Sequence, residues 1–522
     1  TRILALEITN HAGHHEDSYK PFYQLEPDPT GPVQPPFLLC VILAFVPPVA
    51  VPANPLLAEW TGPYGGVPPW DQVRAEAFPQ AFQFAIDERR REYQAIAANP
   101  DAPTFANTIE AMERAGERLD RVQTLFGVMT GNLATPEIQA IQKEWSPKLA
   151  AASDEITLNP ELFQRIKAVY DARETSGLNA SQQRLVTRYY ESRVRNGANL
   201  PPEQKQQLSA YNQQLASAFA EFSEKVLADE GTHIAANEAE MKGVPKDVKD
   251  AALAAAREEK LPPGVYAIRN TRSAVDPILT FADNRDLRER VWRAFVNRGD
   301  NGGANDTNAT IAKIVKIRAD RARLLGFETH AHWRMQDTMA KDPARAMELM
   351  MRVWPAAVAR VKEEVADQAK IARKDGVRTI EPWDYRYYQE KVRKQKYDLS
   401  QDEIKPYFAL DNLVDGMFWS AGQLYGLGFK ENTGTVPVFH PDVRTFEVTD
   451  QASGKVVGLF YLDNFAREGK RSGAWMNAYR SQERFAGEVT TIVSNNANFV
   501  KGQQGEPVLI SWDDATTLFH EF

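Results

Sequence analysis

The sequence predicts a mainly α-helical protein that ends in a small β-sheet. From Asn54 to about Thr435, apolar residues recur at spacings of three and four, which is typical of amphipathic helices. After residue 435, short runs of β-branched and aromatic residues are separated by turn residues, which is typical of strands. The chain has 522 residues, 43% hydrophobic and 25% charged. The length predicts about three domains or one large two-lobed body, and the composition is that of an ordinary globular protein.

Charge and cysteine content exclude several classes of protein. The net charge is -8, and both signs alternate along the chain, which argues against nucleic acid as the main partner. The apolar runs are too short to span a membrane. Cys40 is the only cysteine, so neither a disulfide framework nor a thiolate metal cluster can form. A metal site would have to use His and carboxylate side chains.

Residues 1–53 differ from the rest and predict a leader or disordered tail. An apolar run at 37–46 is followed by small residues, with Val51 and Ala53 at the positions that signal peptidase reads. We therefore expect residues 37–53 to be a signal peptide, which would place the protein in the periplasm. The alternative is a disordered tail with one apolar patch, and then a cytoplasmic protein. His11, His14 and His15 are interpreted as part of this tail rather than as a metal site.

The helices can be placed in order along the chain. The clearest is residues 204–228, with Leu208, Leu215 and Phe222 on one face. Another begins at Asp342-Pro343 and ends near Gly376, and its Met347, Met350 and Met351 are interpreted as core packing rather than as a peptide-binding surface. Further helices are expected at 72–97, 104–130, 134–152, 183–196, 283–298, 307–325 and 386–395. No fixed period relates them, which argues against a helical-repeat solenoid or scaffold.

Five short runs predict strands, and the last residues turn helical again. The runs are 436–439, 445–448, 456–461, 489–493 and 508–510. Residues 512–522 read as a helix with Asp513 or Asp514 as the N-cap.

This last helix carries His520-Glu521. Alone, such a pair indicates little, because it occurs by chance in many proteins. In the motif H-E-x-x-H, two imidazoles four residues apart bind zinc on one face of a helix, and the Glu activates water. The second His of that motif would be residue 524.

Several longer motifs make the chain recognisable. It resembles the thimet-oligopeptidase-like zinc metallopeptidases, and within them the bacterial peptidyl-dipeptidase (dipeptidyl carboxypeptidase) branch, from Asn54 to Phe522. The resemblance is carried by Thr516-Thr-Leu-Phe-His-Glu-Phe522, Arg318 to His330, Lys405-Pro-Tyr407, His440-Pro-Asp-Val-Arg444, Gly458 to Arg467 with Lys470, Gly473-Ala-Trp475, Asn54-Pro-Leu-Leu57 and Thr104 to Ile109.

The resemblance implies a fold and a function. The fold would be a two-lobed, zincin-like helical body with a deep central cleft and a small sheet beside the zinc helix. An N-terminal helical domain would cover 54–240, and 241–522 would form the first part of the catalytic domain. His520 would be a ligand of one zinc ion, and Glu521 the general base. The remaining ligands would follow Phe522, so we expect this 522-residue chain to be inactive by itself. The substrates would be short peptides that lose C-terminal dipeptides, and the protein would be a monomer.

Two other functions remain open. An endo-acting oligopeptidase of the same family would also make internal cuts, and a non-catalytic helical protein would bind peptides without cleaving them. His330 and His332 are interpreted as local hydrogen-bond partners, since their spacing does not converge on one helix face. His440 is a weaker candidate for the lining of the substrate cleft.

Overall fold

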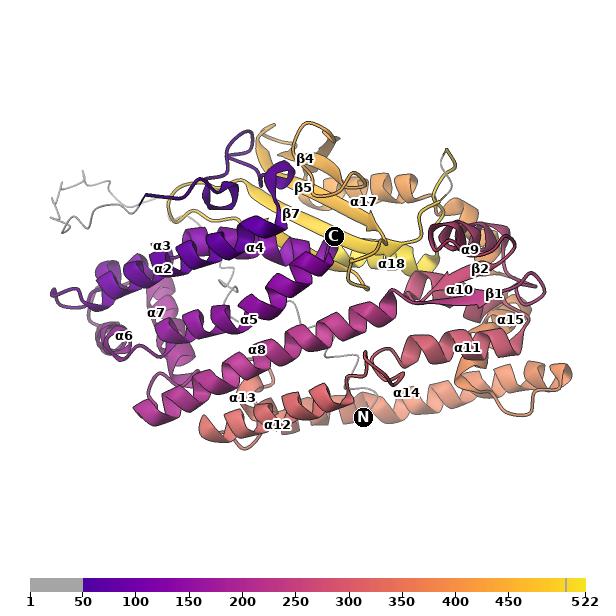
Figure 1. Cartoon of the computed structure of the whole chain (residues 1–522), viewed down its shortest axis with the longest axis horizontal. Coiled ribbons are helices and arrows are strands. Elements are labelled where there is room, and N and C mark those ends of the chain that lie inside the picture. Colours follow the sequence, from indigo (N-terminus) through magenta and orange to yellow (C-terminus); the bar gives the residue numbers. More distant parts are fainter. Residues whose placement is uncertain (1–49, 503–504) are drawn as a thin grey trace.

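The computed structural model describes residues 50–502 and 505–522. The predicted signal peptide at 37–53 therefore lies almost wholly outside the described residues. The described part is mainly helical with small sheets, as predicted, and its helices form roughly parallel rods beside the larger sheet (Figure 1).

The N-terminal helices follow the predicted order, except that the helix at Pro160–Ala172 was not predicted. They are α2 (Phe78–Ala97), α3 (Ala111–Arg114), α4 (Glu117–Asn132), α5 (Pro136–Thr157), α6 (Pro160–Ala172), α7 (Ala180–Arg195) and α8 (Pro202–Glu230). The single helix expected at 104–130 is broken, because Gly116 adopts a left-handed φ of 88° between α3 and α4. A π-helical turn, Phe105–Glu110, precedes α3.

The second half adds ten helices among the described residues. They are α9 (Lys246–Glu258), α10 (Arg272–Phe281), α11 (Arg285–Val296), α12 (Asn308–Leu324), α13 (His330–Met335), α14 (Pro343–Ala372), α15 (Tyr385–Tyr397), α16 (Gln401–Ile404), α17 (Leu410–Tyr425) and α18 (Trp512–Glu521). Helix α8 packs between α5 and α12 (Figure 1). The boundary at 240/241 stays a prediction.

Two antiparallel strands interrupt the region that was expected to be helical throughout. They are β1 (His233–Ala236) and β2 (Tyr266–Arg269), which pair with each other. The five-stranded sheet has the order β3-β4-β5-β7-β6, with β3 (Leu427–Glu431), β4 (Arg444–Asp450), β5 (Val456–Phe465), β6 (Trp475–Arg480) and β7 (Thr491–Phe499). Strands β5 and β7 are parallel, and β6 forms one edge.

The strand predictions are wrong at two places. Residues 436–439 form no strand, and Pro437 there lacks the N–H that a ladder requires. Residues 508–510 contribute only an isolated bridge between Leu509 and Ala409. Strands β3 and β6 went unpredicted because they contain few β-branched residues.

Central strand β5 joins two cores by alternation of its side chains. Leu459 and Tyr461 pack into a core shared with α2, α4 and α5, whereas Phe460 and Leu462 pack into a core shared with α17 and α18. Successive side chains of a strand point to opposite faces, so both faces of the sheet are covered. One face therefore carries the N-terminal helices, and the other carries the helix with His520-Glu521.

Candidate active site on helix α18

Helix α18 begins at Trp512, two or three residues before the start that the predicted caps imply. Its N-cap is Ser511, whose Oγ accepts a hydrogen bond from the Asp514 N–H at 3.0 Å and donates one to the Asp514 carboxylate at 2.8 Å. Asp513 and Asp514 are therefore first-turn residues, and their prediction as N-caps is wrong. The Ser-x-x-Asp spacing is that of a capping box, in which the first residue is the cap.

Ala515 and Leu518 bury one face of α18 against the sheet. The other face leaves His520 exposed, next to the partly buried Glu521. The helix thus presents the predicted metal ligand and the predicted base side by side at its C-terminal end.

Edge strand β6 lies beside Glu521. The backbone N–H of Met476 faces the Glu521 carboxyl. Burial raises the pKa of this carboxyl above its usual range, and His520 and the Met476 N–H oppose that shift. Asn495 of β7 lies opposite Met476. With its amide nitrogen turned toward Glu521, Asn495 donates to the backbone O of Glu521 and accepts from the backbone N–H of Phe522, both at 2.9 Å. Strands β6 and β7 together hold the end of α18.

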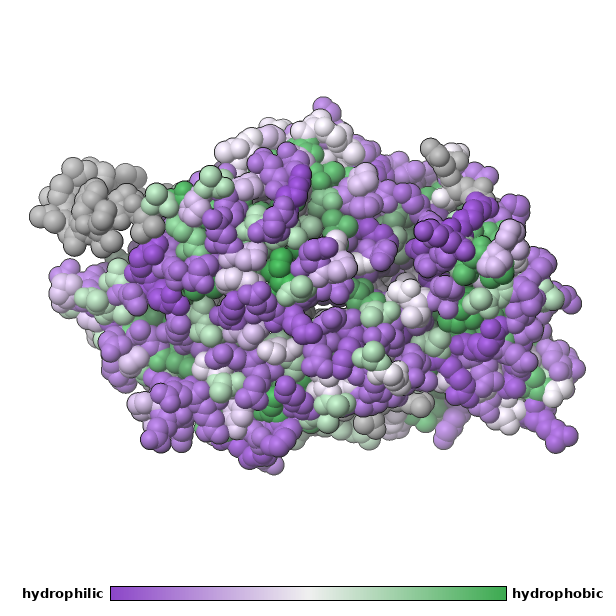
Figure 2. Space-filling view, in the orientation of Figure 1, coloured by the Kyte–Doolittle hydropathy of each residue, from purple (hydrophilic) through white to green (hydrophobic). Residues whose placement is uncertain are grey.

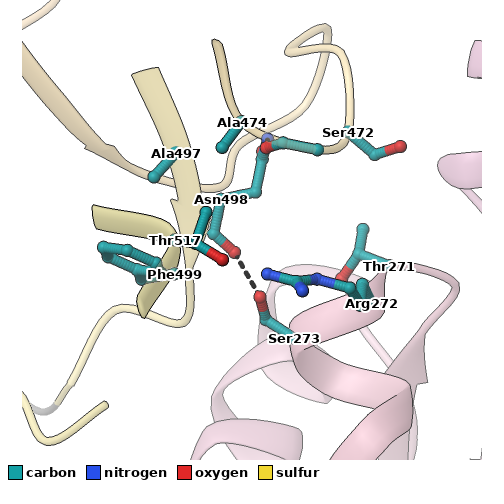
Figure 3. Close-up of a pocket in the computed structure, with 10 residues that line it drawn as sticks. Thr271, Arg272, Ser273, Ser472, Ala474, Ala497, Asn498, Phe499 and Thr517 are labelled. Carbon is teal, nitrogen blue, oxygen red and sulfur yellow. Dashed lines mark hydrogen bonds between the residues drawn. The ribbon is translucent and has the colours of Figure 1, made fainter. Parts of the chain in front are cut away.

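Helix α10 holds the other end of α18. Arg272 pairs with Asp514 at 3.3 Å, and the Ser273 hydroxyl donates to the backbone oxygen of Asn498 in β7 at 2.7 Å (Figure 3). Arg272, Ser273 and Asn498 line a narrow pocket, and Thr517 of α18 lines it as well (Figure 3). Burial raises the pKa of Asp514, whereas Ser511 and Arg272 lower it. The helix is thus fixed by contacts at both of its ends.

The loop between β5 and β6 is joined to the end of α4. Backbone N–H of Arg471 donates to Gly131 O at 2.9 Å, and Nε of Arg467 donates to Asn132 O at 3.0 Å. The last carbonyls of a helix have no partner within the helix, so this loop supplies the missing donors. The edge strand that faces Glu521 is thereby tied to the N-terminal helices.

A buried ionic cluster supports this connection. The carboxylate of Asp463, which is fully buried, lies 3.0 Å from Lys470 Nζ and bonds to the guanidinium of Arg467. Asn132 of α4 donates to the same carboxylate at 2.8 Å and to Asn496 of β7 at 2.7 Å. Lys470 also donates to three backbone carbonyls. Asp463, Arg467 and Lys470 belong to recognised motifs, but no pattern indicated that Asn132 or Asn496 would join them.

The residues present do not complete a zinc site. His520 offers one imidazole, and within residues 50–502 and 505–522 no three His, Cys, Asp or Glu side chains come together as metal ligands.

The other predicted histidines divide into two kinds. His332 bonds to Thr329 Oγ1 at 2.8 Å, which confirms its interpretation as a local partner at a helix start. His440 accepts a hydrogen bond from the Asp442 N–H at 3.2 Å, and its place in a substrate cleft stays a prediction. The ring of His330 packs against Trp333. Its Nδ1 is buried and has no hydrogen-bond partner in the described structure, so the interpretation of His330 as a local hydrogen-bond partner is wrong for Nδ1.

We expect His330 to make the protein sensitive to acid. Burial and the nearby Arg318 and Arg321 lower its pKa from 6.5 to about 3. Between these values the unfolded chain binds more protons, so the free energy of unfolding falls as the pH falls, by at most about 1.4 kcal/mol per pH unit. His330→Gln should remove this part. Urea unfolding measures the fall in the free energy of unfolding between about pH 7 and about pH 5. This fall should be up to about 2 kcal/mol smaller in the variant than in the wild type. Equal losses in both proteins would show that His330 protonates freely in the folded state.

None of the helices among the described residues is both long and apolar enough to cross a bilayer.

Comparison with known proteins gives one consistent result. The profile of peptidase family M3 matches residues 278–522. Dipeptidyl carboxypeptidase of Escherichia coli is 38% identical over 473 residues, which cover 90% of this chain and 69% of the relative. Oligopeptidase A of Salmonella typhimurium is 30% identical over 478 residues, with the same two shares. A thimet-like oligopeptidase of Dictyostelium discoideum is 26% identical over 439 residues, or 80% of this chain and 63% of the relative.

Proposed function

Because the chain belongs to peptidase family M3, we propose that it provides the metal-binding helix and the substrate-binding sheet of a zinc peptidase that releases C-terminal dipeptides from short peptides. The observation that carries this proposal is the His520-Glu521 pair at the exposed end of α18, beside edge strand β6.

His520 and Glu521 have separate roles in this proposal. His520 contributes one imidazole to the zinc ion, and further ligands must come from residues outside the described set. Glu521 accepts a proton from the attacking water and passes it to the nitrogen of the leaving amine. With one ligand of the set, residues 1–522 alone would bind zinc poorly and would be inactive.

The sheet offers a place for an extended peptide. Among the described residues, no strand pairs with the outer side of β6, and Met476 and Ala478 are exposed along it. An extended peptide can add to such an edge through main-chain hydrogen bonds. Because the Met476 N–H faces Glu521, a peptide bound there would run past the proposed base.

Sequence identity favours a peptidyl-dipeptidase over an endo-acting oligopeptidase. The chain is 38% identical to a dipeptidyl carboxypeptidase and 30% identical to an oligopeptidase A over similar lengths. The proposal is tested on an extended chain, in which residues 1–522 are followed by the part of the E. coli dipeptidyl carboxypeptidase that lies C-terminal to the matched region. We expect mass spectrometry to find only C-terminal dipeptides from short peptides, with activity lost on chelation.

The other outcomes identify the alternatives. Internal cuts, and equal rates on peptides with an amidated C-terminus, would indicate an endo-acting oligopeptidase. Peptide binding that a chelator leaves unchanged, without any cleavage, would indicate a peptide-binding protein.

A further inference from the structure

Edge strand β6 is held at both of its ends by contacts from outside the sheet. Among the described strands it pairs only with β7, so the backbone groups on its outer side have no partner strand. A strand of this kind opens easily unless other contacts hold it. Two sets of contacts do so, one directly before the strand and one at its last residue, Arg480.

The first clamp is the contact of Ser472 with Glu230, just before β6. Ser472 donates its backbone N–H to Glu230 Oε2 at 3.1 Å and its hydroxyl to Glu230 Oε1. Glu230 is the last residue of α8, is 8% exposed, and pairs with Arg298 at 2.8 Å. This buried carboxylate therefore joins the end of α8 to the segment that leads into β6.

The second clamp is the contact of Arg480 with residues 64–66. The guanidinium of Arg480 donates to the backbone oxygens of all three of these residues. All three have left-handed φ, of 60°, 71° and 103°, and the first of them, Tyr64, is not a glycine. The Tyr64 hydroxyl donates to Glu447 of β4 at 3.0 Å, which fixes the segment to the sheet. Strained backbone of this kind is often found at functional sites.

Between the two clamps, β6 passes the proposed base. The Met476 N–H faces Glu521, and Arg480 lies four residues further along the strand. At a rise of about 3.3 Å per residue, this distance is about 13 Å. A peptide that pairs with β6 would therefore reach the second clamp only with residues about four positions from the bond that is cleaved.

Peptide binding along a strand edge depends on the geometry of the main chain. No broad apolar groove crosses the face shown in Figure 2, where hydrophobic residues of the described chain form small patches among hydrophilic ones. A strand edge can bind a peptide without such a groove, because the hydrogen bonds come from its main chain. These bonds need a narrow range of distances and angles, so an edge that is held in place binds better than one that must first be ordered.

We propose that Glu230 and Arg480 are positioning residues that keep β6 ordered as a template for an extended peptide. This inference rests on the proposed function, which places the peptide along β6. Glu230 acts on the part of β6 beside the cleaved bond, and Arg480 acts on the far part. When dipeptides are released, only two substrate residues follow the cleaved bond, so the part that reaches Arg480 is the N-terminal part of the substrate.

Binding of intact peptides of increasing length tests the proposal. The extended chain with Glu521→Gln should leave peptides uncleaved, so that calorimetry can measure their Kd. We expect binding to tighten as residues are added at the peptide N-terminus, up to the length that reaches Arg480. Arg480→Met should weaken the binding of these long peptides at least about fivefold more than that of a tripeptide. Glu230→Gln should weaken all lengths by a similar factor.

Two further variants make the comparison specific. Ser472→Ala removes only the hydroxyl contact with Glu230, so it should have the same effect as Glu230→Gln, but smaller, without leaving Arg298 unpaired. Glu240→Gln is the matched control, because Glu240 pairs with Arg290 of α11. It should leave the Kd of every peptide unchanged.

Hydrogen exchange shows whether the clamps hold the strand itself. In the 522-residue chain, residues 475–480 should exchange at least about tenfold faster with Glu230→Gln or Arg480→Met, and α12 should exchange no faster.

Three results would overturn the proposal. Unchanged exchange of β6 in both variants would show that these contacts do not hold it. Equal weakening of short and long peptides by Arg480→Met would assign Arg480 to general stability. Absence of peptide binding at every length would remove the template.

The inference and the proposed function can fail separately. If the extended chain with Glu521 intact cleaves nothing, while peptides still bind with the expected dependence on length, the function fails and the inference stands. If it releases dipeptides while the β6 variants leave Kd unchanged, the function stands and the inference fails.

Discussion

Glu521→Gln in the extended chain is expected to lower kcat for peptide cleavage by about a thousandfold or more. The glutamine amide has nearly the same shape as the carboxylate but cannot accept a proton, and a general base typically contributes 10²- to 10⁴-fold. The substituted side chain lies at the exposed end of α18 beside the edge of β6, so the fold should be unaffected. Steady-state kinetics with a short peptide measure the effect.

Two further measurements connect this loss to the base. Zinc content should stay unchanged, because His520 and not Glu521 is the proposed ligand, and KM should change by no more than about twofold. Asp513→Asn, in the exposed first turn of the same helix, is the matched control and should keep full activity. If Glu521→Gln retained a tenth or more of the wild-type kcat, another residue would have to act as the base.

The sequence predicts the helices better than the strands, for a physical reason. A helix such as α8 repeats its apolar pattern over 29 residues, and local spacing identifies it. Strand β7 extends beyond its β-branched start through Ser494, Asn495 and Asn496, which are buried. Asparagine is disfavoured in strands, and here it is retained because partners such as Asn132 bond to it. Those partners are distant in sequence, so no local pattern reveals them.

The candidate site shows the same division. The motif around His520-Glu521 is local, so the helix that carries these two candidate residues was predictable. The contacts that hold α18, from Arg272 and Asn495, join segments far apart in sequence. The apolar pattern of α14 predicts core packing for its three methionines, but among the described residues these side chains are about half exposed.

Asp463→Asn is expected to lower the free energy of unfolding by roughly 3–5 kcal/mol, the usual cost of leaving a buried charge without its partner. The carboxylate is fully buried, and its negative charge balances the positive charges of Lys470 and Arg467, with which it forms ion pairs. These cations and the amide of Asn132 keep the pKa of Asp463 below its usual range, although burial alone would raise it. The neutral amide would leave the buried cation of Lys470 and the partly buried cation of Arg467 without this counter-charge. Urea unfolding at neutral pH measures the loss.

An exposed ion pair between α17 and strand β4 of the same sheet provides the control. Asp411 bonds to Arg444 at 2.9 Å, but its side chain is 81% exposed, so Asp411→Asn should cost less than about 1 kcal/mol. A comparable loss of free energy of unfolding in both variants would mean that the buried Asp463 cluster stabilises the fold no more than an exposed ion pair does.

A double substitution identifies the cause of the Asp463→Asn effect. Burial lowers the pKa of Lys470 to about 8, which shows that its charge is costly even beside Asp463. Lys470→Met in the Asp463→Asn background removes the uncompensated cation. We therefore expect the double variant to lose less free energy of unfolding than the sum of the two single losses, by at least about 1 kcal/mol. Additive losses would instead assign the effect to hydrogen bonds, since Lys470 donates to the carbonyls of Asp463, Phe465 and Ala497. Because this cluster joins α4 to the strands that hold α18, its weakening should also speed hydrogen exchange in β6 more than in α12.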